Sequence, residues 1–127
     1  MPKAILVSAM SDVFCQFLLE NKTWNTLDIT NVNSDVVGVI EINSICYVIC
    51  RKGITKLPST QYFCKFPSGM DISKACQFKD QVLLFDKFKN NILFNPINRK
   101  LSDTNIRTKI VHFDAAEFLN KVWIVGG

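Results

Sequence analysis

The chain is short of the residues on which most enzymes depend. It has one histidine, His112, only five glycines, and five cysteines without any Cys-x-x-Cys pair. A cysteine–histidine nucleophile needs both groups within hydrogen-bond reach, and nothing in the sequence places a cysteine beside His112. Neither a glycine-rich phosphate loop nor a metalloprotease helix motif is present. We therefore predict a protein that is not an enzyme and that needs no cofactor.

Two cysteines are close in sequence, but their spacing does not suit a metal ion. Cys46 and Cys50 lie four residues apart in an expected strand, and four strand residues span about 13 Å. Two ligands of one zinc ion must each lie about 2.3 Å from it. We predict no metal site, and interpret both thiols as small apolar core residues.

Long hydrophobic runs are also missing. Glu41, Asn43 and Ser44 interrupt the longest apolar stretch, which stays well short of the roughly 20 residues that span a bilayer. The first residues lack the hydrophobic region of a secretory signal. An odd number of cysteines cannot all pair in disulfides. We expect a soluble, reduced, intracellular protein that does not contact a membrane.

The charge that is present is unevenly distributed. The net charge is +4, but residues 1–50 carry two lysines and five acidic residues, whereas residues 51–110 carry twelve basic and four acidic residues. A folded domain with one basic flank is an electrostatic candidate for nucleic-acid binding. The alternative is a surface that is merely basic and well solvated.

Hydrophobic patterning predicts one domain over residues 1–127, with strands in most of it. Ten phenylalanines and many valines and isoleucines favour strands. We expect six to eight short strands, including hairpins of 35–42 with 45–51 and of 81–88 with 91–94, and an alternating strand over 104–113. Helical spacing of Phe14, Phe17 and Leu18 predicts a helix at about 11–22, and Asp114 caps a second, short helix at about 114–120. The predicted fold is a β-rich α+β fold, a small irregular β-barrel with the main helix over one opening.

Basic and aromatic residues alternate in the middle of the chain. The hairpin after residue 86 should expose Lys87, Phe88 and Lys89 at its tip, and the following loop carries Arg99 and Lys100. Cations beside stacking faces hold single-stranded RNA without a sequence code. We predict a partner- or RNA-binding surface, although solvated turns are the alternative. Its residues are Lys87, Phe88, Lys89, Arg99, Lys100, Arg51, Lys52 and Lys65.

The chain ends on Gly126 and Gly127, directly after an apolar stretch expected to be a strand. Glycine has no side chain to pack and loses much freedom on ordering. A papain-like protease that cleaves after Gly-Gly admits only such a thin, extended segment. We predict that these two residues are a protease-processed terminus, and the alternative is coincidence.

The chain resembles the coronavirus non-structural protein 1 family, the leader proteins. The resemblance rests on the terminal Gly-Gly, on the expected order of strand, helix and short strands, and on two segments. In `YVICRKGITKL`, Tyr47, Val48, Gly53, Thr55, Lys56 and Leu57 stand at matching places, and `QVLLFDK` is similar to a later core strand.

The resemblance implies a viral, non-enzymatic effector, released from a polyprotein by a viral papain-like protease. It would act in the host cytoplasm and suppress host gene expression, chiefly translation, through the small ribosomal subunit or mRNA. Longer family members plug the mRNA channel with a C-terminal helical pair that has no counterpart here, so the folded domain itself would make the contact. The alternative function is a small single-stranded nucleic-acid-binding module with a basic, aromatic-lined face.

Overall fold

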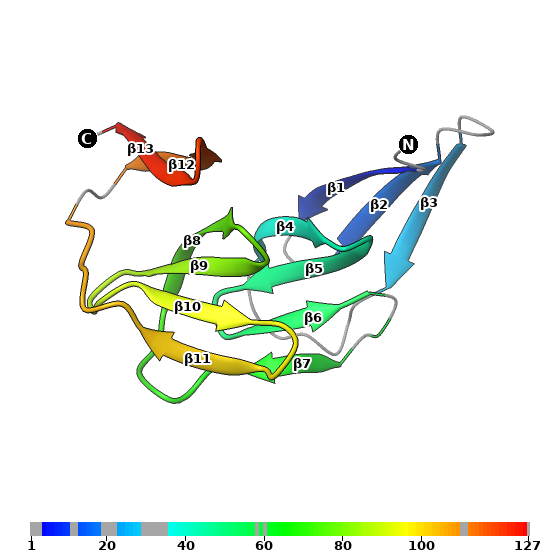
Figure 1. Ribbon diagram of the computed structural model, residues 1–127. Coiled ribbons are helices and arrows are strands. Elements are labelled where there is room, and N and C mark those ends of the chain that lie inside the picture. Colours follow the sequence, from blue (N-terminus) through cyan, green and yellow to red (C-terminus); the bar gives the residue numbers. More distant parts are fainter. Residues whose placement is uncertain are drawn as a thin grey trace.

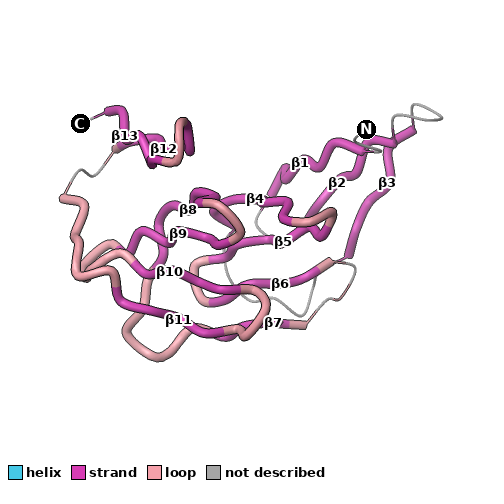
Figure 2. The backbone as a smooth tube through the Cα atoms, in the orientation of Figure 1, coloured by secondary structure: helices cyan, strands magenta, loops and turns pink. Residues whose placement is uncertain are grey.

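A computed structural model describes residues 4–10, 13–18, 23–28, 36–57, 59, 61–109 and 112–126. These residues form thirteen strands and no helix (Figure 1; Figure 2). The strands make four separate antiparallel sheets. The first sheet has the order β1-β2-β3, with β1 at Ala4–Met10, β2 at Val13–Leu18 and β3 at Thr23–Asp28.

Two four-stranded meanders make up the centre of the molecule, and we call them together the sandwich. The first has strands β4 (Val36–Ile42), β5 (Ile45–Cys50), β6 (Gly53–Lys56) and β7 (Tyr62–Lys65). The second has strands β8 (Ile72–Phe78), β9 (Gln81–Asp86), β10 (Ile92–Asn95) and β11 (Lys100–Asp103). Each strand pairs with its neighbour in the sequence, because short connections join them (Figure 1).

One hydrophobic core joins the two meanders. Alternate residues of β5, namely Ile45, Tyr47 and Ile49, pack into it, as expected for the period-two pattern of a strand. From the other sheet, Val82 and Leu84 of β9 contribute side chains that are fully buried. The core continues into the connection between the sheets through Phe66 and Met70.

A hairpin covers the outer face of the second meander. Strands β12 (Phe113–Phe118) and β13 (Lys121–Gly126) pair with each other. Phe113 lies against Phe85 of β9, with their ring centroids 4.9 Å apart in an edge-to-face arrangement. Ala115 and Val122 pack beside them, against the same cluster as Cys76 of β8. The hairpin is therefore attached through its inner face.

The predicted barrel is wrong, because none of the four sheets that the described residues form closes on itself. The two meanders remain separate sheets, with β4, β7, β8 and β11 at their edges. Strand β4 lies near β8 without pairing with it. Successive strands pair with each other within each meander, whereas the connection 66–71 leads from one sheet to the other.

Both predicted helices are wrong as well. Within the expected helix at about 11–22, residues 13–18 form β2, which pairs with β1 on one side and β3 on the other. The expected cap, Ser11, lies outside the described residues. The segment 114–120 belongs to the β12–β13 hairpin, where Leu119 and Asn120 both have positive φ, at 54° and 59°. Two successive residues with positive φ form the turn typical of two-residue hairpins.

Of the other predicted elements, two hairpins are confirmed and one strand is largely wrong. The hairpin around Asn43 and Ser44 is confirmed, and both residues have positive φ there. The hairpin of β9 and β10 is confirmed too. The strand predicted over 104–113 is wrong for residues 104–109, which lie between β11 and β12 without joining a sheet. Local bonds to the Asp103 carboxylate and the Thr104 hydroxyl turn the chain there instead.

Candidate functional site

The turns of the sandwich gather at two opposite ends. The β5–β6 turn, the 66–71 connection and the β9–β10 turn lie at one end, which we call the basic end (Figure 1). The β4–β5, β8–β9 and β10–β11 turns lie at the other, which we call the pocket end. The basic residues predicted as one surface are divided between these two ends.

An arginine–aspartate pair organises the basic end. Arg51 Nε donates to Asp71 Oδ1 at 2.9 Å, and Arg51 Nη2 donates to Asp71 Oδ2 at 3.0 Å. This two-bond geometry is the strong form of a charge-assisted contact. The hydrogen bond from Arg51 lowers the pKa of the Asp71 carboxyl below its usual value, against the opposing effect of burial. Lys87 and Lys52 lower it further by their charge.

A second carboxylate fixes the exposed tip. Asp86, only 4% exposed, accepts the backbone N–H groups of Phe88 and Lys89 at 2.9 and 3.2 Å. Its other oxygen accepts the N–H of Asp71 at 3.1 Å. Asp86 thus ties the β9–β10 turn to the start of β8. The predicted exposure of the tip is confirmed, because Phe88 is 66% exposed and Lys87 and Lys89 are exposed beside it.

Two further lysines complete the basic end. Lys52 Nζ donates to the carbonyl of Met70 at 3.1 Å. Lys65 is exposed and pairs with Gly53, next to Lys52. In the part of the chain that the structure describes, the ammonium groups of Lys65, Lys87 and Lys89 make no ion pair. The basic end therefore consists of Arg51, Lys52, Lys65, Lys87, Phe88 and Lys89.

Arg99 and Lys100 lie at the opposite end. They follow the β10–β11 turn, where the side-chain oxygens of Asn95 and Asn98 accept the N–H groups of Ile97 and Lys100. Arg99 has a φ of 60°, which is unfavourable for a residue with a Cβ. Its guanidinium carbon lies 4.1 Å from the centre of the Phe63 ring.

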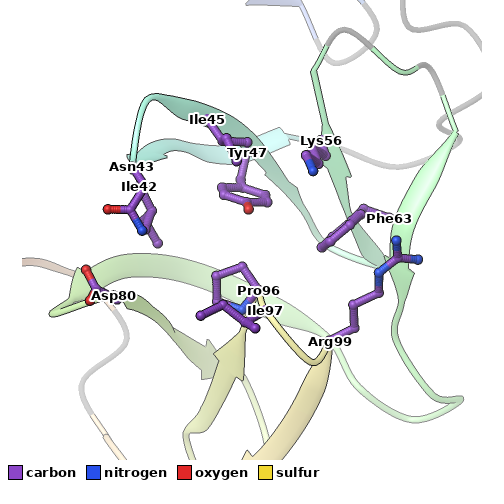
Figure 3. Close-up of a pocket in the computed structure, with 10 residues that line it drawn as sticks. All are labelled: Ile42, Asn43, Ile45, Tyr47, Lys56, Phe63, Asp80, Pro96, Ile97 and Arg99. Atoms are coloured by element: carbon purple, nitrogen blue, oxygen red, sulfur yellow. The ribbon is translucent and has the colours of Figure 1, made fainter.

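A cavity of about 310 Å³ opens at the pocket end. Its walls come from both meanders, with Tyr47 pointing into it between Asp80 on one side and Phe63 and Arg99 on the other (Figure 3). Lys56 Nζ lies 5.3 Å from the centre of the same Phe63 ring that Arg99 contacts. The lining residues are Ile42, Asn43, Ile45, Tyr47, Lys56, Phe63, Asp80, Pro96, Ile97 and Arg99.

Two aromatic residues of the pocket, Tyr47 and Phe63, form a continuous row of rings with Phe94 of the core. The rings of Tyr47 and Phe63 are 5.8 Å apart, and those of Phe63 and Phe94 are 6.2 Å apart. Burial raises the pKa of the Tyr47 hydroxyl above its usual value. The row links the cavity to the core and holds its walls in place.

The cysteines show no arrangement for catalysis or metal binding among the described residues. Cys46, Cys64 and Cys76 are free thiols, and no group of three possible metal ligands occurs in that part of the chain. Burial raises the pKa of Cys46, Cys64 and Cys76. A raised pKa lowers the thiolate fraction, which is the reactive form.

Gly126 has a structural role of its own. It is the last residue of β13, pairs with Phe113 and has a φ of 135°. A Cβ at this position would lie 2.5 Å from the His112 carbonyl oxygen and 2.8 Å from Phe113 Cα. Close backbone approach therefore explains glycine at 126 without reference to proteolysis. Gly127 lies outside the described residues, and processing after Gly-Gly stays a prediction.

Comparison with protein-family models and with curated proteins finds no match to this chain. Within the described residues, no helix is long and apolar enough to cross a membrane.

Several residues that organise these two sites were not predicted from the sequence. Asp86 was not assigned to any site, but it is buried and accepts hydrogen bonds from three backbone N–H groups. Lys56, Phe63 and Asp80 were not assigned to any site, because they lie on three separate connections or strands. An aspartate two or three residues before exposed turn residues is a usable signal, since its carboxylate readily accepts their N–H groups.

Proposed function

We propose that the protein is a non-enzymatic binding protein whose basic end holds single-stranded nucleic acid. The observation that carries this proposal is the tip formed by Lys87, Phe88 and Lys89. It presents a largely exposed aromatic ring between two cations that make no ion pair among the described residues. Single-strand binding combines such charges with aromatic faces on which bases stack.

The rigidity of the tip supports the same function. The two N–H bonds to Asp86 and the bond from Lys87 N to the Asp71 carbonyl hold the turn in one shape. Arg51 and Lys52 extend the positive surface beside it. Because these hydrogen bonds already fix the β9–β10 turn, it loses less conformational entropy on binding than a flexible loop would.

A titration of fluorescent single-stranded RNA at two salt concentrations tests the proposal. The logarithm of affinity should fall linearly with the logarithm of salt concentration. Replacing Lys87 and Lys89 together by alanine should weaken binding and reduce the salt slope by about 1.4, since each single-strand phosphate contact contributes roughly 0.7.

The aromatic contribution has a matched control within the chain. Phe88→Ala should weaken binding by roughly 1–3 kcal/mol for each stacked base, while Phe118→Ala should leave it unchanged. The two rings are similarly exposed, at 66% and 64%, but Phe118 lies on the β12–β13 hairpin. Equal effects of the two changes, or binding insensitive to salt, would contradict the proposal.

Suppression of host gene expression is a second proposal. The corrected fold removes the strand–helix order on which part of the resemblance rested. The basic end still offers a surface for mRNA or ribosomal RNA of the small subunit. Reporter synthesis in cells, with reporter mRNA measured in parallel, should fall with the natural chain and recover with the Lys87/Lys89 variant. If the protein is well expressed and reporter output is unchanged, this second proposal is wrong. The RNA-binding proposal would then be tested separately by the titration.

A further inference from the structure

The outer side of the β12–β13 hairpin carries a patch of exposed apolar side chains. Residues directly opposite each other on paired strands share one face of the sheet, and three such pairs are exposed here. We call them the hairpin face, which consists of Asp114 with Val125, Ala116 with Trp123, and Phe118 with Lys121. Phe118, Trp123 and Val125 are 64%, 51% and 73% exposed. Contiguous exposed apolar side chains rimmed by polar ones mark interaction sites.

The inner side of the same hairpin is already occupied. Phe113, Ala115 and Val122 pack against residues of β8 and β9, and Glu117 Oε2 accepts the backbone N–H of Lys79 at 2.6 Å. Successive side chains of a strand point to opposite faces, so the hairpin face lies on the side away from β8. Figure 1 places this hairpin at the edge of the molecule, beside β8. The hairpin face is therefore open to a partner.

The indole of Trp123 is held in the middle of the hairpin face. Its Nε1–H donates to the carbonyl oxygen of Phe118 at 2.8 Å, so the polar atom of the ring is satisfied within the hairpin. The rest of the exposed indole is apolar, and Trp123 lies opposite Ala116, whose side chain is small. An aromatic side chain that is already fixed loses little entropy when a partner binds. Trp123 is thus suited to be the centre of an interface.

The two charges of the hairpin face lie at its opposite ends. Asp114 is paired with Val125 at one end, and Lys121 is paired with Phe118 at the end next to the turn. Asp114 and Phe118 are four residues apart in β12, which is about 13 Å along a strand, so Asp114 and Lys121 are too distant to pair within one hairpin. Neither makes an ion pair with another described residue, and Asp114 Oδ1 accepts the N–H of Ala115 at 3.0 Å.

A face with this order of charges is complementary to itself. A two-fold axis across the strands at the middle of the face places the Asp114 end of one hairpin over the Lys121 end of a second copy. Two ion pairs between the copies then form, one at each end, and the two Trp123 rings meet near the axis. In a two-fold dimer the same patch of both subunits forms the contact, and such dimers are the commonest homo-oligomers. The charge order therefore favours a second copy of this chain over a different partner.

We propose that the protein forms a two-fold dimer in which two hairpin faces pack against each other in antiparallel orientation. Phe118, Trp123 and Val125 of both copies form its apolar centre, and Asp114 of each copy pairs with Lys121 of the other. A face two strands wide and about 13 Å long is smaller than the roughly 800 Å² per partner of a standard interface. The dimer therefore dissociates on dilution. The hairpin face is separate from the basic end and does not depend on its function.

Analytical ultracentrifugation of the full chain over a range of concentrations tests this proposal. The natural chain should change from monomer to dimer as its concentration rises. Trp123→Ala should raise the dissociation constant of the dimer by about tenfold or more, because a central tryptophan is removed from both sides of the contact. Phe88→Ala is the matched control, since it removes a ring that is 66% exposed at the basic end, and it should associate as the natural chain does.

Charge variants test the antiparallel arrangement without removing an apolar contact. Asp114→Lys and Lys121→Asp should each weaken self-association by about fivefold or more at low salt, because two pairs of like charge replace two ion pairs. An equimolar mixture of the two variants should recover the association of the natural chain, since every pair in the mixed dimer again has opposite charges. A variant that had merely lost its hairpin would not recover on mixing.

The results that contradict the dimer are equally clear. A natural chain that stays monomeric up to its solubility limit overturns the proposal and leaves a different protein as the occupant of the hairpin face. Equal association of Trp123→Ala and Phe88→Ala places the contact elsewhere on the molecule and also overturns it. Failure of the mixed charge variants to associate excludes the antiparallel pairing of Asp114 with Lys121.

Discussion

At the scale of single residues, two carboxylates determine the shape of the basic end. Asp71 binds the guanidinium of Arg51, and Asp86 binds three backbone N–H groups. The proposed nucleic-acid-binding surface thus contains two acidic side chains. Both carboxylates are engaged in hydrogen bonds that position neighbouring groups. The lysines at the tip keep their positive charge available.

Stability should depend on pH through Asp71. Its pKa is lowered in the folded chain, so its ionised form stabilises the fold above the unfolded pKa of about 4. That contribution is lost as the pH falls through the lower folded value. Asp71→Asn should therefore cost about 1 kcal/mol near neutral pH, a value reduced by the partial exposure of Arg51.

Urea denaturation at about pH 7 and about pH 2.5 measures this effect. The difference between the natural chain and Asp71→Asn should be smaller in acid, because the Asp71 carboxyl loses its charge as the pH falls through its lowered pKa. Asp80→Asn is the control, since Asp80 is exposed and should show little effect at either pH. A difference that is the same at both pH values would refute the role assigned to Asp71.

The backbone conformation of Arg99 should make glycine more favourable than alanine at this position. Arg99→Gly and Arg99→Ala both remove the guanidinium, but only glycine adopts a φ of 60° without cost. Arg99→Gly should therefore be more stable than Arg99→Ala by about 1 kcal/mol. Thermal denaturation of the two variants measures the difference, and equal stability would mean that the turn relaxes to another conformation.

At the scale of elements, the β12–β13 hairpin shows what the sequence could and could not predict. The segment around Asp114 has a capping residue and helix-compatible alanines and glutamate, which favour a helix locally. Phe113, Ala115 and Val122 instead pack against β8 and β9. That burial follows a period of two, and it depends on partners such as Phe85 and Cys76, which are distant in the sequence and which no local pattern reveals.

The hairpin should be sensitive to Gly126. Alanine there would bring its Cβ to within 2.8 Å of Phe113 Cα and 2.5 Å of a carbonyl oxygen, with φ in an unfavourable region. Gly126→Ala should loosen the hairpin and reduce amide protection in β12 and β13, at a cost of about 1–3 kcal/mol. Hydrogen exchange measures it residue by residue.

Gly38 provides the matched control for that experiment. It lies in β4, and a Cβ there would meet no atom within 4 Å. Gly38→Ala should be neutral or stabilising by roughly 0.5 kcal/mol, because alanine restricts the unfolded chain. If both alanine variants behave alike, close backbone approach is not the reason for glycine at 126.

At the scale of the whole molecule, one core couples the two meanders. Leu84 is fully buried in it among residues from both sheets. Leu84→Ala should cost about 2–5 kcal/mol and reduce amide protection in β4–β7 as much as in β8–β11. Ile97→Ala, at a position 85% exposed, should change little. Loss of protection in one meander alone would show that the sheets unfold independently.

The same scale explains why the candidate sites were only partly predicted. The basic block is visible in the sequence, and the tip at Lys87, Phe88 and Lys89 follows from a correctly predicted hairpin. Charge counting cannot reveal that Arg99 lies at the opposite end, because this depends on the direction in which each strand runs. Lys56 and Phe63 reach Arg99 only after the two meanders pack together.

Two buried cysteines can be used to measure how often separate regions of the molecule open. Cys50 and Cys76 are buried in two different clusters, one beside β5 and β6 and the other beneath the β12–β13 hairpin. An alkylating reagent can reach each of them only when its own region opens. The labelling rate of each cysteine, followed by mass spectrometry, therefore measures how often that region opens. Two rates from a single sample would report the opening of the β12–β13 hairpin separately from the opening of the cluster of Cys50, Val48, Val36, Leu57 and Tyr62 on the outer face of the first meander.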